Sequence, residues 1–201
     1  MTRWLALLLV LAALALPGWG KPPVRVLLIG ASVGESWDFP GLPARTGLKG
    51  FTLSYEGLYD FDKSPALGTS LRSRPRPDAV ILKECAAYFP GDQAAYQRLV
   101  KGWVAQCRQA GVVPILTTVC PVTEKGEQLQ GICGYNDWVR SYAGREKLPL
   151  LDLEAALRRS PGDRRLDPKY AQDDGLHLVD AGYRRLDALV PPLLRKVFPP
   201  G

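Results

Sequence analysis

The sequence predicts an α/β fold in which helices cover both faces of a parallel sheet. Three observations lead to this fold class. Five short apolar runs have the length of buried strands, helical patterns separate them, and 201 residues with 46% hydrophobic side chains suffice for one domain but not for two ordinary ones. Strands that alternate with helices form parallel sheets, whose ligands bind at the carboxyl ends of the strands. Functional residues are therefore expected in the loops that follow the strands.

The expected strands are runs of four to seven residues rich in aliphatic and β-branched side chains. The first ends at Gly30, and the third is introduced by Pro75, Pro77 and Asp78. Such runs fit strands that are buried on both faces, whereas the second alternates like a strand with one solvated side. The five runs are residues 24–29, 51–56, 79–82, 112–118 and 148–151.

Helices are expected between these runs. The clearest begins after Asp92, a favourable N-cap, and ends at Gly111, and its apolar residues recur at the spacing of one helical face. A second helix is expected to begin near Asn136 or Asp137. A last one follows Asp180 and reaches residue 190, where two consecutive prolines interrupt it.

The first twenty residues have the layout of a secretory signal peptide. Arg3 precedes an apolar run, residues 4–16, which is shorter than the roughly 20 apolar residues of a membrane-spanning helix, and Pro17, Gly18 and Gly20 follow it. We therefore expect residues 1–20 to be removed and residues 21–201 to form a single periplasmic or secreted domain with no stable membrane span. The alternative is an uncleaved segment that anchors the protein in a membrane.

Composition and charge exclude several classes of protein. A charged fraction of 23% and a moderate glycine and proline content exclude a disordered chain, a collagen-like fibre and a multi-pass membrane protein. The formal net charge is +6, but the basic residues are dispersed, as Arg72, Arg74 and Arg76 of one loop illustrate. An exported protein without a long Lys/Arg run is not expected to bind nucleic acid. Attraction to an anionic glycan or lipid surface stays open.

The first candidate functional residue is Ser32, in the segment Gly30-Ala31-Ser32-Val33-Gly34 directly after the first strand. A serine at a strand-to-helix turn can present its hydroxyl at the carboxyl edge of the sheet, where free helical N–H groups favour a developing oxyanion. Two alternatives are a serine that only caps the helix and a phosphate-binding turn. The second is weak, because no established phosphate-loop pattern is present.

The second candidate is the pair Asp174 and His177 before the last helix. His177 is the only histidine, so chemistry that needs two imidazoles is excluded. An aspartate three residues before a histidine can accept a hydrogen bond from the ring Nδ1–H, which fixes the tautomer and stabilises the imidazolium. The alternative is an exposed histidine in a polar turn. The coincidence of this pair with Ser32 favours nucleophilic catalysis.

Together these segments resemble the SGNH, or GDSL-type, serine esterases over most of residues 21–201. The resemblance implies that Ser32 is the nucleophile, that His177 is the general base and that Asp174 orients it. It also implies an oxyanion hole made by the backbone N–H groups of Ser32 and Gly57. The implied fold is a flavodoxin-like three-layer α/β/α sandwich with strand order 2-1-3-4-5, and neither a metal nor an organic cofactor is expected.

The chain departs from the family pattern in two blocks. Ala31 stands where the first block usually has aspartate, and Ala87 stands where the third block usually supplies an oxyanion-hole asparagine. The only asparagine is Asn136, and either it or Lys83 is a candidate substitute donor. Loss of one oxyanion donor typically lowers turnover by about 10²–10³. The departure thus leaves three alternatives: a substitute donor, a slow enzyme or a binding protein on an esterase scaffold.

Four cysteines allow three complete pairings, and export permits disulfides. Cys85, Cys120 and Cys133 are expected near the carboxyl edge, whereas Cys107 is expected near the end of a helix that runs the other way. We therefore predict a Cys120–Cys133 bridge across a polar loop, and a buried free thiol at Cys107. A zinc site is not expected, because no Cys-x-x-Cys pair is present.

Aromatic residues follow several of the expected strands and are candidates for the rim of a substrate cleft. Trp37, Tyr59 and Tyr88 are the predicted substrate-binding residues, since aromatic rims suit a sugar or an acyl group. Phe61 and Trp138 are instead expected to cap the core.

The first functional hypothesis is an exported serine esterase that cleaves a carboxylic ester of a small molecule or glycan through an acyl-enzyme, such as an O-acetyl or short acyl ester of a sugar. The alternative is a weakly active or non-catalytic protein that binds cell-envelope glycan on the same scaffold. A nucleotide-binding domain is a weaker third interpretation, because a phosphate loop is missing.

Overall fold

The computed structural model describes residues 21–199, so the predicted signal peptide lies outside the described residues. Its centre is a five-stranded sheet with order β2-β1-β3-β4-β5, in which all neighbouring strands run parallel. The strands are β1 (Val24–Gly30), β2 (Phe51–Gly57), β3 (Ala79–Leu82), β4 (Val113–Thr117) and β5 (Leu150–Leu151). This order confirms the expected flavodoxin-like topology.

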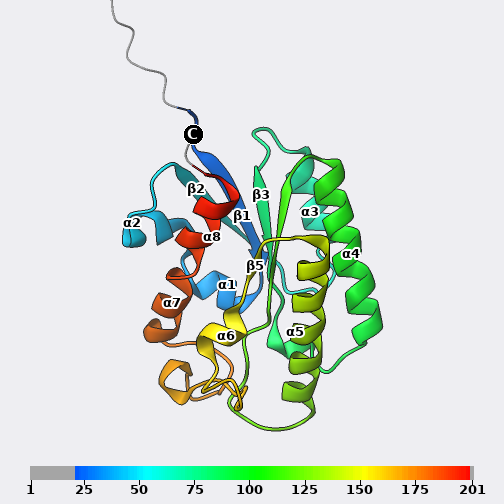
Figure 1. Cartoon of the computed structure of the whole chain (residues 1–201), viewed down its shortest axis with the longest axis vertical. Helices are drawn as coiled ribbons and strands as arrows, with labels where there is room; N and C mark the ends of the chain where they lie inside the picture. The colour runs from blue at the N-terminus through cyan, green and yellow to red at the C-terminus, as the bar shows by residue number, and fades with distance from the viewer. Residues whose placement is uncertain (1–20, 200–201) are drawn as a thin grey trace, which may run out of the picture.

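Helices cover both faces of the sheet, as Figure 1 shows. One face carries α3 (Ser64–Arg72), α4 (Gln93–Gln109) and α5 (Glu127–Glu146). The other carries α1 (Ser32–Ser36), α2 (Leu42–Thr46), α6 (Leu153–Leu157), α7 (Asp180–Asp187) and α8 (Val190–Val197). Three 3₁₀ turns complete the fold: η1 (Phe39–Gly41), η2 (Ala86–Tyr88) and η3 (Pro168–Tyr170).

Each face of the sheet packs against its helices in a separate apolar core. Leu28 and Ile81 belong to the core under α1, α2 and α6–α8, whereas Ile29 and Leu82 belong to the core under α3–α5. This division follows from the strand geometry, because successive side chains point to opposite faces. Strands that feed two cores are apolar throughout, which explains the continuous runs in the sequence.

Several element boundaries match the expected ones. The Asp92 side chain accepts a hydrogen bond from the Ala95 N–H at 2.9 Å and begins α4, while Gly111, with φ of +67°, follows the end of the helix. Strand β5 is shorter than expected. Its predicted first residue, Leu148, instead donates its N–H to the Ala143 carbonyl at the end of α5.

The expectation that a helix begins near Asn136 or Asp137 is wrong. Helix α5 begins at Glu127, so Asn136 lies in its middle. Its first two turns contain mostly polar residues and glycine beside Leu129 and Ile132, so their amphipathic signal is weak. Gly131 lies so close to the segment after η2 that a Cβ there would be 2.6 Å from Pro90 Cα. This close approach of the two backbones is invisible in a hydrophobic pattern.

The break in the C-terminal helical region lies just before the two prolines. Helix α7 ends at Asp187, and α8 begins at Val190, so that Pro191 and Pro192 occupy its first turn. Proline is tolerated there because its missing N–H has no partner within the helix. None of the helices within residues 21–199 combines the length and the apolarity needed to cross a membrane.

Candidate active site

Ser32, the candidate nucleophile, lies where β1 passes into α1. We call residues 30–34 the nucleophile turn. The Ala31 carbonyl accepts hydrogen bonds from the N–H groups of Gly34 at 2.7 Å and Glu35 at 3.1 Å, which begins the helix. The side chain of Ser32 makes no capping bond, so the interpretation of this residue as a helix cap is wrong. Its hydroxyl instead faces the loop before α7, and the residue is half-buried.

Tyr55 on β2 supports this turn from the neighbouring strand. Its hydroxyl donates to the carbonyls of Gly30 at 2.8 Å and Ala31 at 3.3 Å. A Cβ on Gly34 would lie 2.9 Å from the Tyr55 ring, so the ring requires glycine at this position. Burial raises the pKa of Tyr55 to about 12, which keeps the phenol a neutral donor. Because a trans peptide points its C=O and N–H in opposite directions, the bond to the Ala31 carbonyl also orients the N–H of Ser32.

The loop between η3 and α7 brings His177 to the nucleophile turn. His177 Nε2 lies 2.9 Å from Ser32 Oγ, and His177 Nδ1 lies 2.5 Å from Asp174 Oδ2. The other carboxylate oxygen of Asp174 accepts the backbone N–H groups of Leu176 and His177, both at 2.9 Å. The His177 hydrogen bond, together with these two, lowers the pKa of Asp174 to about 2. Asp174 is therefore a carboxylate at any neutral pH.

One hydrogen bond from the segment after β4 and one within the loop hold this loop in place. The Thr123 N–H donates to the Gly175 carbonyl at 3.0 Å, and the Gln172 N–H donates to the His177 carbonyl at 2.8 Å. Gly175 has φ of +68°, and a Cβ there would lie 2.1 Å from Thr123 Oγ1. Glycine at this position allows the segment after β4 to approach the Asp174 turn closely.

Gly57 ends β2 directly beside Gly30, its partner in the strand register. The Leu58 N–H donates to the Gly30 carbonyl at 2.9 Å, and consecutive N–H groups of a strand point to opposite sides. The Gly57 N–H therefore points away from β1. This orientation directs the Gly57 N–H away from the strand that carries Ser32, so it does not support the expected role of Gly57 as an oxyanion donor.

Comparison with known proteins identifies the family and the fold. The family model described as GDSL-like lipase/acylhydrolase matches residues 46–185. The chain belongs to this family. The match starts after Ser32, so the assignment of the nucleophile rests on the fold and the contacts rather than on the matched segment. No curated protein matches the chain.

Solved structures of SGNH-type hydrolases share the fold. A GDSL-like lipase from Bacteroides thetaiotaomicron is 19% identical with a TM-score of 0.68, and the alignment covers 87% of this chain and 89% of that one. An acetyl xylan esterase is 18% identical with a TM-score of 0.69, covering 87% and 100%. An acetyl-xylooligosaccharide esterase from Geobacillus is 16% identical with a TM-score of 0.64, covering 88% and 95%. Family and fold thus identify the chain as an SGNH-type ester hydrolase.

The resemblance aligns Ala87 with the asparagine of the third family block. Ala87 lies exposed on η2 and offers no polar side chain. Asn136 is not a substitute, because it is fully buried, accepts the Val119 N–H at 2.7 Å and donates to the Val119 carbonyl and to Glu154. Lys83 is also buried, and its ammonium donates to the Glu84 carbonyl at 3.1 Å.

The sequence analysis missed Gln128, the side-chain amide that contacts this block. Its Nε2 donates one hydrogen to the Ala86 carbonyl at 3.0 Å, next to the alanine that replaces the family asparagine. Among the described residues, the second hydrogen of this amide has no acceptor in the protein. Gln128 is 41 residues from Ala87 and lies in the polar first turn of α5, so only the tertiary structure reveals the contact.

A buried ion pair holds the segment of the third block, since Glu84 lies three residues before Ala87 and binds Lys63. Lys63 Nζ lies 2.9 Å from Glu84 Oε2, and both side chains are almost fully buried. The ammonium also lies 5.5 Å from the Trp103 ring centroid and 5.8 Å from that of Phe61. Glu84 is therefore neither solvated nor paired with its neighbour Lys83. Lys63 is the partner of Glu84, and burial raises the pKa of Glu84.

The three predicted aromatic rim residues have different environments. Trp37 is 1% exposed, and its indole donates to Asp187 Oδ1 at 2.8 Å, so its prediction as a substrate-binding residue is wrong. Tyr88 is half-buried against Phe61, with ring centroids 5.5 Å apart. Tyr59 is 61% exposed and donates to Glu35 of α1, close to the nucleophile turn. Only Tyr59 keeps the exposure expected of a rim.

The core assignment of the other two aromatic residues holds. Phe61 is buried, and Trp138 packs beside the same core with its ring stacked on Tyr142 at 5.2 Å. These rings are therefore part of the folded interior.

The predicted Cys120–Cys133 disulfide is not formed, and all four cysteines are free thiols. Cys133 lies on α5 and not in a loop, because the helix begins nine residues before Asn136. Cys120 is buried in the core under α1 and α6–α8. The expectation of a buried free thiol at Cys107 is confirmed, and burial raises its pKa to about 12.

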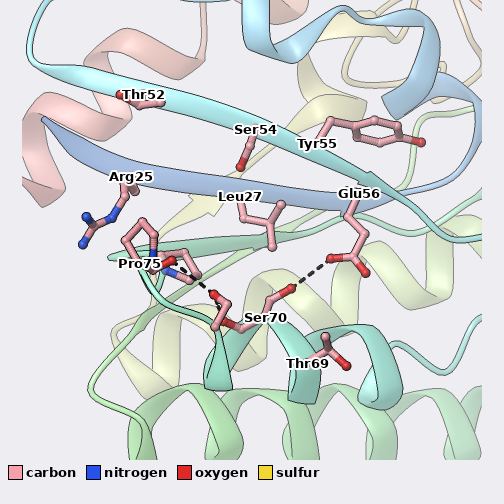
Figure 2. Close-up of a pocket in the computed structure, with 11 residues that line it drawn as sticks. Arg25, Leu27, Thr52, Ser54, Tyr55, Glu56, Thr69, Ser70 and Pro75 are labelled. Carbon is pink, nitrogen blue, oxygen red and sulfur yellow. Dashed lines mark hydrogen bonds between the residues drawn. The ribbon is translucent and has the colours of Figure 1, made fainter.

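A surface hollow lies away from this site, between β2 and α3 (Figure 2). Thr52, Ser54 and Glu56 reach it from alternate positions of the edge strand, and Ser70 Oγ donates to Glu56 at 2.9 Å across it. Glu56 is a carboxylate near the end of β2, and its bond to Ser70 holds it in this hollow, away from the Ser32–His177 contact.

Proposed function

We propose that this SGNH hydrolase is an exported serine esterase whose catalytic residues are Ser32, His177 and Asp174. The observation that carries the proposal is the continuous chain from Asp174 Oδ2 through both ring nitrogens of His177 to Ser32 Oγ, with distances of 2.5 and 2.9 Å. A carboxylate that holds Nδ1–H leaves Nε2 as the acceptor for the serine proton.

The steps of the reaction follow from these roles. Ser32 Oγ attacks the ester carbonyl carbon while its proton passes to His177 Nε2. The oxyanion accepts hydrogen bonds from the N–H group of Ser32 and from a side-chain amide, that of Gln128. The alcohol then leaves with the proton from His177, and an acyl-enzyme remains. Water repeats the sequence, releasing the acid and restoring the serine hydroxyl.

We assign the side-chain oxyanion donor, which the family takes from its third block, to Gln128. Its amide hydrogen-bonds the carbonyl of Ala86, beside the position of the family asparagine, and has a second hydrogen available. The Gln128→Ala variant is expected to lower kcat by about tenfold to a hundredfold, within the range for one oxyanion donor. Gln93→Ala is the matched control, because the Gln93 amide also donates to backbone carbonyls nearby, those of Pro90 and Gly131. Equal loss in both variants would contradict this role.

The substrate we propose is a short acyl ester, in particular an acetyl ester of a sugar. Ser32 and His177 are half-buried and Asp174 is exposed, so the site is shallow and suits a small acyl group with the alcohol portion towards solvent. The exposed ring of Tyr59 offers a stacking surface near the nucleophile turn. Two proteins of similar fold are named as esterases of acetylated xylan or its oligosaccharides.

The decisive experiment compares acetate release from p-nitrophenyl acetate and from acetylated xylo-oligosaccharides by the wild type and by Ser32→Ala, His177→Ala and Asp174→Asn. Each variant is expected to lose at least about 10³-fold in kcat while it keeps its thermal unfolding transition. A fluorophosphonate should label the wild type and leave Ser32→Ala unlabelled. Turnover by Ser32→Ala at the wild-type rate would overturn the assignment of the nucleophile.

Export is tested separately. The whole chain is expected to reach the periplasm or the medium of a Gram-negative host and to lose residues 1–20, whereas a chain that starts at Lys21 should stay in the cytoplasm. Terminal sequencing of the exported form distinguishes cleavage from an uncleaved membrane anchor.

A second candidate function is glycan binding without turnover. The observation that favours it is Ala87, which removes the side-chain donor of the third block. It predicts that acetylated xylo-oligosaccharides bind equally to the wild type and to Ser32→Ala, and that neither releases acetate. Binding accompanied by Ser32-dependent acetate release rejects this candidate.

A further inference from the structure

Basic residues collect at the edge of the sheet where the strands begin, which we call the amino edge. All five strands are parallel, so the loops that precede them lie at this one end, opposite the Ser32 site. Within residues 21–199 the amino edge holds two carboxylates, Asp78 and Glu146. It holds eleven basic residues: Lys21, Arg25, Lys49, Arg72, Arg74, Arg76, Arg108, Arg145, Lys147, Arg195 and Lys196.

Most of these basic groups have no acidic partner. Arg25 lies 3.8 Å from Asp78, and Arg108 lies 3.0 Å from Glu146. In the described part of the chain, the other nine make no salt bridge. The rest of residues 21–199 holds 14 basic and 18 acidic side chains, so the whole positive excess of the folded part lies at this edge.

The amino edge is a connected surface rather than a set of scattered charges. Lys21, Lys49 and Arg195 line one hollow, Arg25, Arg74 and Arg76 line a second, and Phe198 lines both. The half-buried Phe198 ring packs against Phe51 with centroids 6.3 Å apart. Figure 1 shows the start of β1, the end of α8 and the loop before β3 at this same end of the molecule. Basic side chains thus line two hollows on either side of the contact between Phe198 and Phe51.

The residues that precede β1 in the sequence suggest which kind of surface lies next to the amino edge. The apolar run of residues 4–16 is separated from the first residue of β1 by seven residues, 17–23, which span at most about 25 Å even when fully extended. Whatever membrane holds that run during or after export therefore lies within reach of the amino edge. Basic groups spread over the loops at one end of the sheet suit a broad anionic surface.

We propose that the amino edge binds an anionic lipid surface. Lysine and arginine side chains near such a surface are attracted to its headgroups, and the effect falls within a Debye length. The strands then stand away from the lipid, and β1, with seven residues, places the Ser32 site roughly 20 Å from the edge. The active site faces solvent, where a polymeric or soluble ester can reach it. This inference does not depend on the proposed ester hydrolysis.

The test uses residues 21–201, which lack the apolar run, and phosphatidylcholine vesicles with or without 30 mol% phosphatidylglycerol. These residues include the whole sheet and both helical layers, and they contain the fold that the crystallised chain of an acetyl xylan esterase has. The edge variant carries Lys49→Gln, Arg74→Gln, Arg76→Gln and Lys196→Gln. The control variant carries the same number of neutral substitutions at exposed sites elsewhere, Arg98→Gln, Lys101→Gln, Lys125→Gln and Arg184→Gln.

Both variants lose the same net charge, so only the location of the charge differs. The wild type and the control variant are expected to sediment with the anionic vesicles and not with the neutral ones. The edge variant should bind the anionic vesicles at least about a hundredfold more weakly, since each basic group at such a surface contributes roughly fivefold. Raised salt should release the wild type.

Three results would overturn the proposal: no binding of the wild type to anionic vesicles, equal weakening in both variants, or tighter binding to polygalacturonate of equal charge than to the vesicles. The last result would assign the edge to an acidic polysaccharide. Because the assay measures binding alone, its failure is distinct from a failure of the proposed esterase activity.

Discussion

The Tyr55→Phe substitution tests how the neighbouring strand supports the nucleophile turn. The change removes one hydroxyl and keeps the ring that packs on Gly34. Two hydrogen bonds to the carbonyls of Gly30 and Ala31 are lost, one short at 2.8 Å and one weak at 3.3 Å. A neutral hydrogen bond contributes about 1 kcal/mol net, so the free energy of unfolding should fall by about 1–1.5 kcal/mol. The corresponding fall in Tm is about 2–6 °C.

The effect on catalysis follows from the second bond. The Ala31 carbonyl keeps its bonds from the N–H groups of Gly34 and Glu35, so the peptide loses only part of its support. The Ser32 N–H on the other side of this peptide is a proposed oxyanion donor, and complete loss of one donor lowers turnover by about 10²–10³. Partial misorientation should therefore lower kcat by about tenfold while KM stays within about twofold.

The assay is the steady-state hydrolysis of p-nitrophenyl acetate beside a thermal melt. Tyr96→Phe is the matched control, because the Tyr96 hydroxyl also donates to a backbone carbonyl, that of Tyr88 at 2.7 Å, without contacting the nucleophile turn. It should lose similar stability and keep its kcat. Equal kcat values for the two variants, or a change confined to KM, would refute the positioning role of Tyr55.

Three further predictions concern other parts of the site. Asn136→Leu leaves the buried N–H and carbonyl of Val119 without partners and should lower the free energy of unfolding in urea by about 2–5 kcal/mol; a loss below 1 kcal/mol would contradict the burial of this network. In the native protein a thiol reagent should modify Cys133 first, and all four thiols should react after unfolding, whereas only two would react if a disulfide had formed. Because the pKa of Asp174 lies at about 2, well below the ordinary value of 3.8, its carboxylate should stay ionised above about pH 3. The carboxyl carbon shift of Asp174 in NMR should then show no titration step between about pH 3.5 and 5, where an ordinary aspartate titrates, and a step in that range would contradict the low pKa.

The main elements of the site were predictable because their signals are local. Ser32 directly follows a strand, and Asp174 and His177 lie three residues apart. In a parallel sheet the chain returns to the same edge after every strand, so residues that follow different strands approach one another without further information. The structure accordingly brings Ser32 and His177, 145 residues apart, within hydrogen-bond distance.

The wrong predictions share a different cause. Trp37 follows the first strand as expected, but a partner far along the chain, Asp187, decides that its indole points inward. Position along the chain places a residue at an edge of the sheet; it does not say which way the side chain turns. The same reasoning applies to Cys133, which follows the fourth strand as expected but lies on α5 and not in a loop.

The third block illustrates both limits at once. Alignment by position predicts that Ala87 stands at the place of the donor asparagine, but it gives no indication of what holds the loop in its place. The buried pair of Lys63 and Glu84 holds it, with an ammonium enclosed by aromatic rings. A buried charge whose partner is removed costs several kcal/mol, so this loop can tolerate changes on its exposed side more readily than at the pair. This difference explains how alanine can stand at the exposed position of the family asparagine while the surrounding backbone keeps its place. The amide of Gln128 on α5 can then contact that backbone.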